Sequence, residues 1–229
     1  MKTSAKGLIF DYGGTIDTNG VHWGEVIRRA YERFGVPVTR DAFREAYVQV
    51  ERTLGSRAVI RPDHTFREVL RIKLSLQFEI LNIRDMSLAE RIADACHADT
   101  VRTTLAASNV LDRLTQRYPA VLVSNFYGNL RTVLDEFRLS RYFKHVIESA
   151  EAGIRKPDPA IYLSGIEALG LRPEETVIIG DSYKNDIHPA CTLGCPSIWL
   201  KGKGWDDRDE TIEHPCIIKD FTELQDLLL

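Results

Sequence analysis

A set of five short apolar runs, rich in Val and Ile, limits the possible folds more than any other feature of this sequence. Runs of this kind are typical of strands buried on both faces of a parallel sheet. Helical patterns separate the later runs, and two of them stop at Gly170 and Gly194. This alternation predicts βαβ units and a doubly wound, Rossmann-like α/β fold. The predicted strands are residues 7–11, 120–125, 145–149, 176–181 and 196–200, the helices between them 129–138, 159–169 and 186–193, and a short edge strand and closing helix are expected in 213–229.

The interval between the first two runs, about a hundred residues long, breaks this alternation. Apolar side chains recur at helical spacing in 26–35 and in 39–54. The segments "TFRE" (65–68) and "SLAE" (87–90) both match the capping-box pattern that precedes helices. We therefore predict an inserted, all-helical cap domain of three to five helices. The resulting domains are a core of residues 1–17 and 106–229 and a cap of residues 18–105.

Length and composition exclude several classes of protein. A chain of 229 residues can bury a large core without disulfides, and its net charge of -3 argues against a nucleic-acid binder. No run approaches the roughly 20 apolar residues of a membrane span, and the N-terminus has no apolar segment typical of a signal peptide. We therefore expect a cytoplasmic protein that acts on a small molecule. The sequence does not specify an oligomeric state.

The four cysteines are scattered, which favours free thiols in a reducing compartment. A zinc site at His188, Cys191 and Cys195 is an alternative, but this spacing is unusual and no second ligand pair is near.

The predicted cap is rich in arginine. Residues 18–105 hold 14 basic residues, 13 of them arginine, against 12 acidic ones, so the balance is +2. These arginines either solvate the helix faces or line a cleft where they bind an anionic substrate in forked hydrogen bonds.

Polar side chains lie where three of the predicted strands end. The carboxyl ends of parallel strands meet at one edge of a sheet, so these side chains should converge with a lysine that follows another strand. Crowded carboxylates repel one another, and a divalent cation such as Mg²⁺ relieves that repulsion, while a lysine and a serine beside it suit a phosphoryl group. Such polar residues also commonly start turns or cap helices. The set is Asp11, Ser124, Asn125, Lys156, Asp181 and Asp186.

Four segments resemble, in order, the motifs of the haloacid dehalogenase (HAD) superfamily. "FDYGGTID" is similar to the family's D-x-D-x-T motif, and "VLVSN" to its second motif, a hydrophobic strand that ends in Ser or Thr. "RKPDPAIY" resembles the third motif, with its lysine, and "IIGDSYKNDI" the fourth, G-D-x-x-x-x-D. The helical insert is similar to the cap of the family's C1 class. The resemblance implies a Mg²⁺-dependent hydrolase, most often a phosphatase of small phosphorylated metabolites.

Carried over to this chain, the resemblance assigns roles to the residues of the first three motifs. Asp11 is the expected nucleophile, which forms an aspartyl-phosphate, and Thr15 orients its loop. Ser124 and the N–H of Asn125 are expected to hold the phosphoryl group, and Lys156 to pair with it and with Asp11.

The expected metal site shows one departure from the family pattern. Asp11, Asp181 and Asp186 match the family's metal-binding positions, the last directly or through water. The second aspartate of the first motif is replaced by Gly13, whose carbonyl can still bind the metal but which has no acid/base side chain. General acid–base catalysis is typically worth about 10²–10⁴ in rate, so the loss affects the reaction without removing its nucleophile.

Three interpretations of Gly13 remain open. The first is a phosphohydrolase whose substrate needs no acid, or whose acid/base is another residue: Tyr12, Asp17, His22 and Glu25 are candidates. The second is C–P or C–halogen cleavage, as in the family's phosphonatases and dehalogenases; the former use a cap lysine as a Schiff base. The only lysine of the predicted cap, Lys73, is expected to be exposed on its helix. The third is a catalytically weak regulatory protein that binds a metal and an anion.

Overall fold

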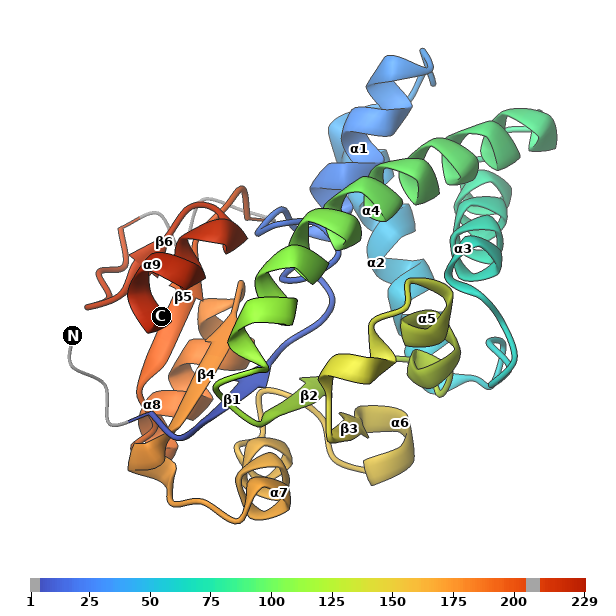
Figure 1. Cartoon of the computed structure of the whole chain (residues 1–229). Helices are drawn as coiled ribbons and strands as arrows, with labels where there is room; N and C mark the ends of the chain where they lie inside the picture. Colours follow the sequence, from blue (N-terminus) through green and yellow to red (C-terminus); the bar gives the residue numbers. More distant parts are fainter. Residues whose placement is uncertain (1–4, 205–210) are drawn as a thin grey trace.

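A computed structural model describes residues 5–204 and 211–229 as a three-layered α/β core with a helical insert (Figure 1). The described strands form one six-stranded sheet in the order β3-β2-β1-β4-β5-β6, and every neighbouring pair is parallel. The predicted doubly wound fold is therefore confirmed. The strands are β1 (Gly7–Phe10), β2 (Ala120–Ser124), β3 (His145–Glu148), β4 (Thr176–Gly180), β5 (Ser197–Leu200) and the edge strand β6 (Ile217–Ile218).

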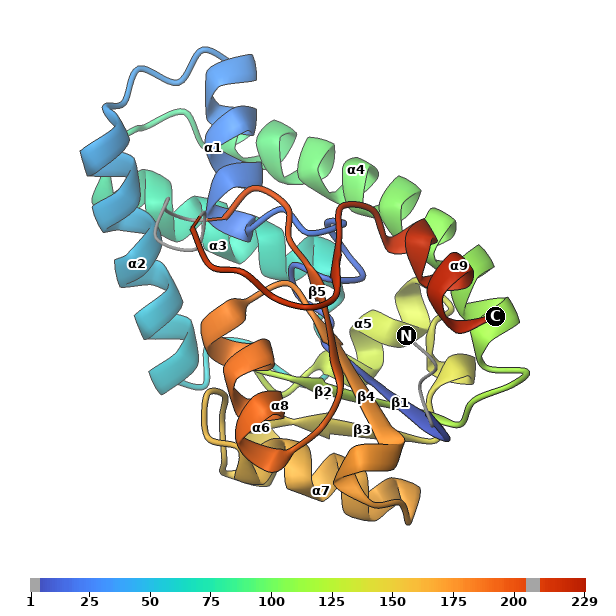
Figure 2. The same ribbon diagram turned by 90° about the vertical axis from the view of Figure 1, so that its left-hand side faces the viewer.

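Successive strand residues point to opposite faces of the sheet, and each face has its own helical layer. Ile9 packs with α7 (Ala160–Leu169) and α8 (His188–Leu193) on one face. Leu8 and Phe10 pack on the other face, which is covered by the end of α4 (Met86–Leu114), by α5 (Leu130–Glu136) and by α9 (Leu224–Leu228). Figure 2 shows the sheet between these two layers. Shorter elements are α6 (Ser149–Ala152), 3₁₀ turns at Ser140–Tyr142, Pro173–Glu175 and Phe221–Glu223, and a π-helical turn at Tyr183–Ile187.

Four helices fill the interval between β1 and β2, as predicted for the cap. Thr65 and Glu68 form the expected capping box at the start of α3 (Phe66–Ile80). The second predicted capping box is wrong: Ser87 lies inside α4, and the side chain of Asp85 caps that helix by accepting a hydrogen bond from the Leu88 amide. The cap helices are α1 (Trp23–Arg33), α2 (Arg40–Ser56), α3 (Phe66–Ile80) and α4 (Met86–Leu114).

The helix α4 belongs to both parts of the molecule. It is 29 residues long and runs without a break through residue 105, where the sequence analysis puts the end of the cap. Its first part packs on α3 and α1, and its last part contacts α9 of the core. Figure 1 shows this single helix extending from the cap bundle down to the sheet.

Hydrogen bonds also connect the cap to the core. Four of them join the segment that follows β2, residues 127–136, to the second half of α2, to the chain that leads into α3, or to the first residue of α3. They join Tyr127 OH to Glu51 (2.6 Å), Asn129 Nδ2 to the His64 carbonyl (2.7 Å), Thr132 Oγ1 to the Pro62 carbonyl (2.6 Å) and the Phe66 amide to Glu136 (2.5 Å).

Three further expectations concern cysteines, metals and membranes. All four cysteines are free. In residues 5–204 and 211–229, His188, Cys191 and Cys195 do not belong to any group that could hold a metal. None of the described helices combines the length and the apolar character that a membrane span needs. Residues 1–4, on which the signal-peptide expectation partly rests, lie outside the described residues.

Candidate active site

The strand register brings the predicted site residues to one edge of the sheet. Phe10, the last residue of β1, pairs with Leu122 of β2 and with Ile179 of β4. Asp11, Ser124 and Asp181 follow within two residues of these positions, so they emerge side by side at the carboxyl ends of the three central strands. This is the edge where open parallel sheets bind their ligands.

Asp11 is buried, with 5% of its surface exposed, and three side chains donate hydrogen bonds to its carboxylate. Lys156 Nζ lies 2.5 Å from Oδ1, and Ser124 Oγ lies 3.4 Å from the same oxygen. Thr15 Oγ1 lies 2.9 Å from Oδ2. These donors hold the carboxylate in one orientation and offset part of its charge.

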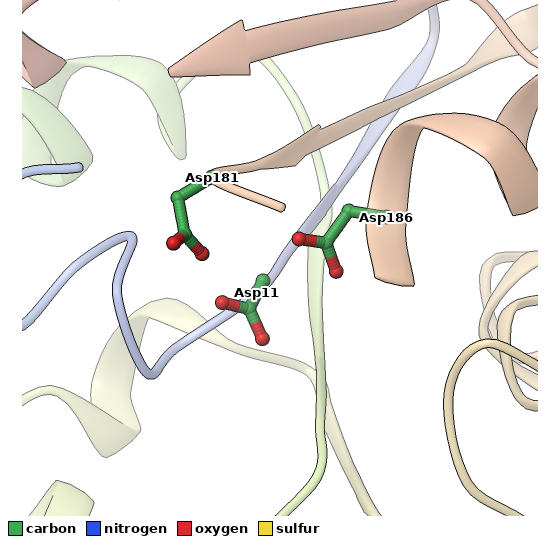
Figure 3. A group of neighbouring side chains, drawn as sticks. All are labelled: Asp11, Asp181 and Asp186. Carbon is green, nitrogen blue, oxygen red and sulfur yellow. The ribbon is translucent and has the colours of Figure 1, made fainter. Parts of the chain in front are cut away.

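Three carboxylates gather at this edge and point toward one another (Figure 3). One oxygen each of Asp11, Asp181 and Asp186 lies within 4.8 Å of the others. Burial raises the pKa of Asp11 to about 6, since the attraction of Lys156 only partly offsets burial and the charge of Asp186. Burial, and then the charges of Asp11 and Asp186, raise the pKa of Asp181 well above its ordinary value. One lysine does not balance three closely spaced carboxylates, and their oxygens are the ligands that a hard divalent cation prefers.

Asp186 is tied to its surroundings by hydrogen bonds on both oxygens. Its Oδ1 accepts from Lys156 Nζ (2.8 Å) and from Tyr162 OH (2.6 Å), and its Oδ2 accepts from the Ser182 amide (2.9 Å). The ring of Tyr162 also lies 5.1 Å from the ammonium of Lys156. Tyr162 therefore orients both groups, a role that sequence reasoning missed because an aromatic residue in the first turn of a helix does not reveal which way it points.

Asn125 acts through its side chain on the backbone of Lys156. Its Oδ1 accepts from the Lys156 amide (2.9 Å) and its Nδ2 donates to the Lys156 carbonyl (3.1 Å). The two bonds tie the loop that carries the lysine to the end of β2. Glu148, at the end of β3, was not among the predicted site residues: it accepts hydrogen bonds from the amides of Gly128 and Leu130 and so holds the chain that follows Asn125.

The two glycines after Tyr12 differ in what their positions allow. Gly14 has a φ of +99°, and an added Cβ would lie 2.4 Å from Oδ2 of Asp181. Only glycine fits there, because the backbone is left-handed and a carboxylate occupies the space. A Cβ on Gly13 would meet no atom within 4 Å, and its φ lies outside the left-handed region. The missing side chain at position 13 is therefore not a steric requirement of the fold.

The four candidate replacements for the missing acid/base lie in different surroundings. Asp17 is buried, and it accepts hydrogen bonds from the Gly14 amide (2.7 Å) and from Trp23 Nε1 (2.8 Å). Burial raises its pKa to about 7 although these two donors lower it. Tyr12 is fully buried, and its hydroxyl has no hydrogen-bond partner among the described residues. His22 caps α1 through the Gly24 amide, and Glu25 forms ion pairs with Arg28 and Arg29.

The expectation that Lys73 is exposed is wrong. Only 6% of its surface is accessible, and its ammonium lies 2.7 Å from Oε1 of Glu51 and 5.2 Å from the ring centre of Tyr127. Burial lowers the pKa of Lys73, but Glu51 and Tyr47 outweigh this, so the pKa is raised overall. We call Lys73, Glu51 and Tyr127 the cap cluster. Periodicity missed it because α3 packs on α2 with a face that contains a lysine.

Comparisons with known proteins agree with this arrangement. The family model of the haloacid dehalogenase-like hydrolases matches residues 5–190. Glyceraldehyde 3-phosphate phosphatase from Pyrococcus furiosus is 36% identical over 100 residues, which are 43% of this chain and 39% of the relative. Phosphoglycolate phosphatase from Salmonella choleraesuis is 32% identical over 93 residues, 40% of this chain and 36% of the relative. Each alignment therefore spans well under half the length of the curated relative.

Solved structures resemble the chain over nearly its whole length. A dehalogenase in an intermediate complex superimposes with a TM-score of 0.68 at 17% identity, covering 100% of this chain and 99% of the other. YfnB from Bacillus subtilis, in a structure bound to magnesium, superimposes with a TM-score of 0.58 at 20% identity and covers 98% of both chains. At these identities the likeness establishes a shared fold, including the helical insert after β1.

Proposed function

Because the chain belongs to the haloacid dehalogenase-like hydrolases, we propose that it is a Mg²⁺-dependent phosphatase of small phosphorylated metabolites. The observation that carries this proposal is the position of Asp11, with Lys156 Nζ 2.5 Å from one side of its carboxylate and Asp181 and Asp186 gathered beside it. A buried nucleophile beside a fixed cation is an arrangement suited to an incoming phosphoryl group.

The proposed reaction has two displacements at phosphorus. A carboxylate oxygen of Asp11 bonds to phosphorus, the ester P–O bond breaks, and the alcohol leaves with a proton from solvent. Water then attacks the phosphorus of the aspartyl-phosphate, which releases inorganic phosphate and regenerates Asp11. Lys156 and Ser124 stabilise the charge on the phosphoryl oxygens, and Thr15 keeps Asp11 oriented.

The donor set fits a magnesium ion. Its residues would be Asp11, Asp181 and the carbonyl of Gly13, with Asp186 binding directly or through water. The raised pKa values of Asp11 and Asp181 support this assignment, because they mark carboxylates with too few positive charges around them. When bound, the ion would supply positive charge that offsets the charge of both the carboxylates and the phosphoryl group.

We propose that the reaction proceeds without an acid/base at position 13. Esters whose leaving group departs easily, such as aryl or acyl phosphates, need little protonation and should react best. Among the candidate replacements, Asp17 has a pKa raised to about 7, which suits proton transfer near neutral pH. Its two hydrogen bonds to Gly14 and Trp23 instead favour a structural role in the loop.

The burial of Lys73 raises an alternative, which is cleavage of a C–P bond through a Schiff base on this lysine. A lysine must be neutral to attack a carbonyl carbon, and Glu51 keeps Lys73 protonated. We therefore favour phosphate-ester hydrolysis. Treatment with phosphonoacetaldehyde and borohydride should leave Lys73 unmodified, as checked by mass spectrometry; a reduced adduct on Lys73 would favour the alternative.

The direct test is hydrolysis of p-nitrophenyl phosphate and of a phosphometabolite panel, run with Mg²⁺ and with a chelator. We expect slow, Mg²⁺-dependent release of phosphate by the parent protein and none by Asp11→Asn. Hydrolysis by a folded Asp11→Asn protein at the parent rate would contradict the assignment of the nucleophile. Mg²⁺ binding without turnover of any ester would favour the regulatory interpretation.

A further inference from the structure

Lys73 is the one cation of the cap that is buried. No arginine of the insert is buried, and several are paired on the surface, such as Arg67 and Arg71 with Asp94. An ammonium carries three N–H donors, whereas within residues 5–204 and 211–229 the contacts of Lys73 Nζ are one carboxylate oxygen of Glu51 and the ring face of Tyr127. Burying a charge is costly unless it is fully paired, so an ammonium with spare donors in a cap is an unusual feature.

The cap cluster lies beside the sheet-edge site. Tyr127 is three residues after Ser124, and a chain of three residues spans at most about 11 Å. The hydroxyl of Tyr127 donates to Oε2 of Glu51 (2.6 Å), so the loop that follows Ser124 is bonded directly to the partner of Lys73. The charge of Lys73 is also close enough to Asp17 to lower its pKa, and Asp17 accepts a hydrogen bond from the loop at Gly14.

We propose that Lys73 recognises a carboxylate on the non-reacting end of the substrate, and that Glu51 and Tyr127 position its ammonium. This inference rests on the proposed phosphatase function and names the substrate class: small phosphate monoesters that also carry a carboxylate. A substrate whose phosphoryl group is held beside Asp11 and Lys156 would then present its far end to a second lysine.

The charges of the cluster favour a carboxylate over a second phosphoryl group. Glu51 already offsets the single charge of Lys73, so a dianion would face Glu51 with an excess negative charge. A monoanionic carboxylate takes the spare N–H donors with less repulsion. The hydroxyl of Tyr127 holds Glu51 on the side of its other oxygen, which keeps the carboxylate of Glu51 from turning toward the ligand.

Two substrates that differ in one group test the inference. 3-Phosphoglycerate and glycerol 3-phosphate share their skeleton, but the former has a carboxylate where the latter has a hydroxymethyl group. We expect the parent protein to show a kcat/KM about 10- to 100-fold higher for 3-phosphoglycerate, the range of a hydrogen bond to a charged group. Lys73→Met should remove this preference and change kcat/KM for glycerol 3-phosphate by less than about threefold. Arg67→Met, on the exposed face of the same helix, is the matched control and should retain it.

Each other outcome overturns the inference. The inference fails if the parent protein has equal kcat/KM values for the two esters, or if Lys73→Met keeps the preference for 3-phosphoglycerate. It also fails if the Lys73→Met substitution lowers kcat/KM equally for both esters. If Lys73→Met does not fold, inhibition of p-nitrophenyl phosphate hydrolysis in the parent protein provides the test. We then expect 3-phosphoglycerate to inhibit at least about tenfold more tightly than glycerol 3-phosphate. Equal inhibition by the two esters rejects the inference. A parent that hydrolyses p-nitrophenyl phosphate through Asp11 without discriminating the esters rejects this inference alone, whereas a parent without Asp11-dependent hydrolysis rejects the proposed function too.

Discussion

The sheet edge and the cap cluster both bury charged side chains, but different features of the chain assemble them. At the sheet edge, Asp11, Ser124 and Asp181 lie at the carboxyl ends of adjacent strands, so their position in the sequence determines their position in space. In the cap cluster, Glu51 and Lys73 come from the middle of two helices, and only the packing of those helices brings them together. A site in a parallel sheet can therefore be predicted from the residues at the strand ends, whereas a site in a helical bundle depends on which helix faces pack together.

The two regions also differ in net charge. Three carboxylates face one lysine at the sheet edge, so that region carries an excess of negative charge until a cation binds. The cap cluster pairs one carboxylate with one lysine and is balanced by itself. A metal ion should therefore act on the first region only, and changes in the second should alter substrate choice and not the chemical step.

Replacing Asp11, the proposed nucleophile, should have the largest effect. Asp11→Asn should lower turnover of every phosphate ester by at least about 10⁴-fold, because the bond to phosphorus cannot form. Lys73→Met should leave hydrolysis of p-nitrophenyl phosphate within about threefold of the parent, since that ester has no carboxylate. Steady-state kinetics of both variants, with thermal melting to confirm folding, measures the contrast. Equal losses on p-nitrophenyl phosphate would remove the distinction between the two regions.

Two glycines with positive φ, Gly14 at the sheet edge and Gly35 in the cap, allow a comparison of the steric constraints in the two parts of the molecule. Gly14→Ala should destabilise the protein by about 3 kcal/mol and greatly reduce activity, because the new Cβ both strains the backbone and contacts the carboxylate of Asp181. Gly35→Ala, after α1 in the cap, meets no atom within 4 Å and should cost only about 1 kcal/mol. Urea unfolding gives both values. A cost for Gly14→Ala no larger than that for Gly35→Ala would show that the site loop relaxes freely.

Magnesium should stabilise the sheet edge in a pH-dependent way. Without metal, the raised pKa of Asp11 means that its contribution to stability is present below about pH 3.8 and is lost as the pH rises through about 6. Mg²⁺ at about 100 times its Kd should restore about 2.7 kcal/mol near pH 7.5, or roughly 5–10 °C in Tm. Calorimetry with Mg²⁺ and with a chelator measures the shift. Lys73→Met should keep it and Asp181→Asn should lose it; an unchanged parent Tm would contradict the metal assignment.

Restoring a carboxylate at position 13 should accelerate the less reactive esters. The space around Gly13 is open, so Gly13→Asp should fold and supply an acid for the leaving group. We expect hydrolysis of glycerol 3-phosphate to rise about 10-fold or more, toward the range of general acid catalysis, and hydrolysis of p-nitrophenyl phosphate to change little. Equal effects on both esters would contradict the idea that the absence of an acid at position 13 limits hydrolysis of the less reactive ester.

The smallest effect is expected where the two regions meet. Tyr127→Phe removes the hydrogen bond to Glu51 and should lower the free energy of unfolding by about 1 kcal/mol. Turnover of p-nitrophenyl phosphate should stay within about twofold of the parent, while the KM for 3-phosphoglycerate should rise several-fold because Lys73 is less well positioned. Tyr118→Phe, whose hydroxyl donates to the Leu228 carbonyl at the far end of the core, is the matched control. A changed KM in that control would indicate a general loss of stability.

Most of the core was predictable from the sequence because its signals are local. Buried Val- and Ile-rich runs mark the strands, and Gly170 and Gly194, both with positive φ, end their helices as expected. The residues at the strand ends were predictable for the same reason. Tyr162 was not, because its contact with Asp186 depends on how α7 lies across the sheet.

The helices of the cap were predictable from the sequence, but the burial of their charged side chains was not. Its helical stripes were read correctly, whereas the burial of Lys73 depends on the partner that Glu51 provides from a different helix. None of the cap arginines is buried, and the interpretation that some of them line a substrate cleft stays a prediction. The composition of the cap, which is rich in arginine, gave no indication that Lys73 is the cation that helix packing buries.

The continuity of α4 makes the number of its residues a determinant of the cap's orientation. One residue inserted between positions 105 and 114 would turn everything before it by about 100° around the helix axis and advance it by about 1.5 Å. Lys73 would be carried away from the loop that follows Ser124, and the hydrogen bonds between residues 127–136 and the cap would lose their partners. Relatives with a helix one residue longer or shorter here would thus present another side of the bundle to the aspartate that follows β1. Insertions and deletions in this stretch, far from any reacting atom, are a route by which such an enzyme could exchange one substrate for another.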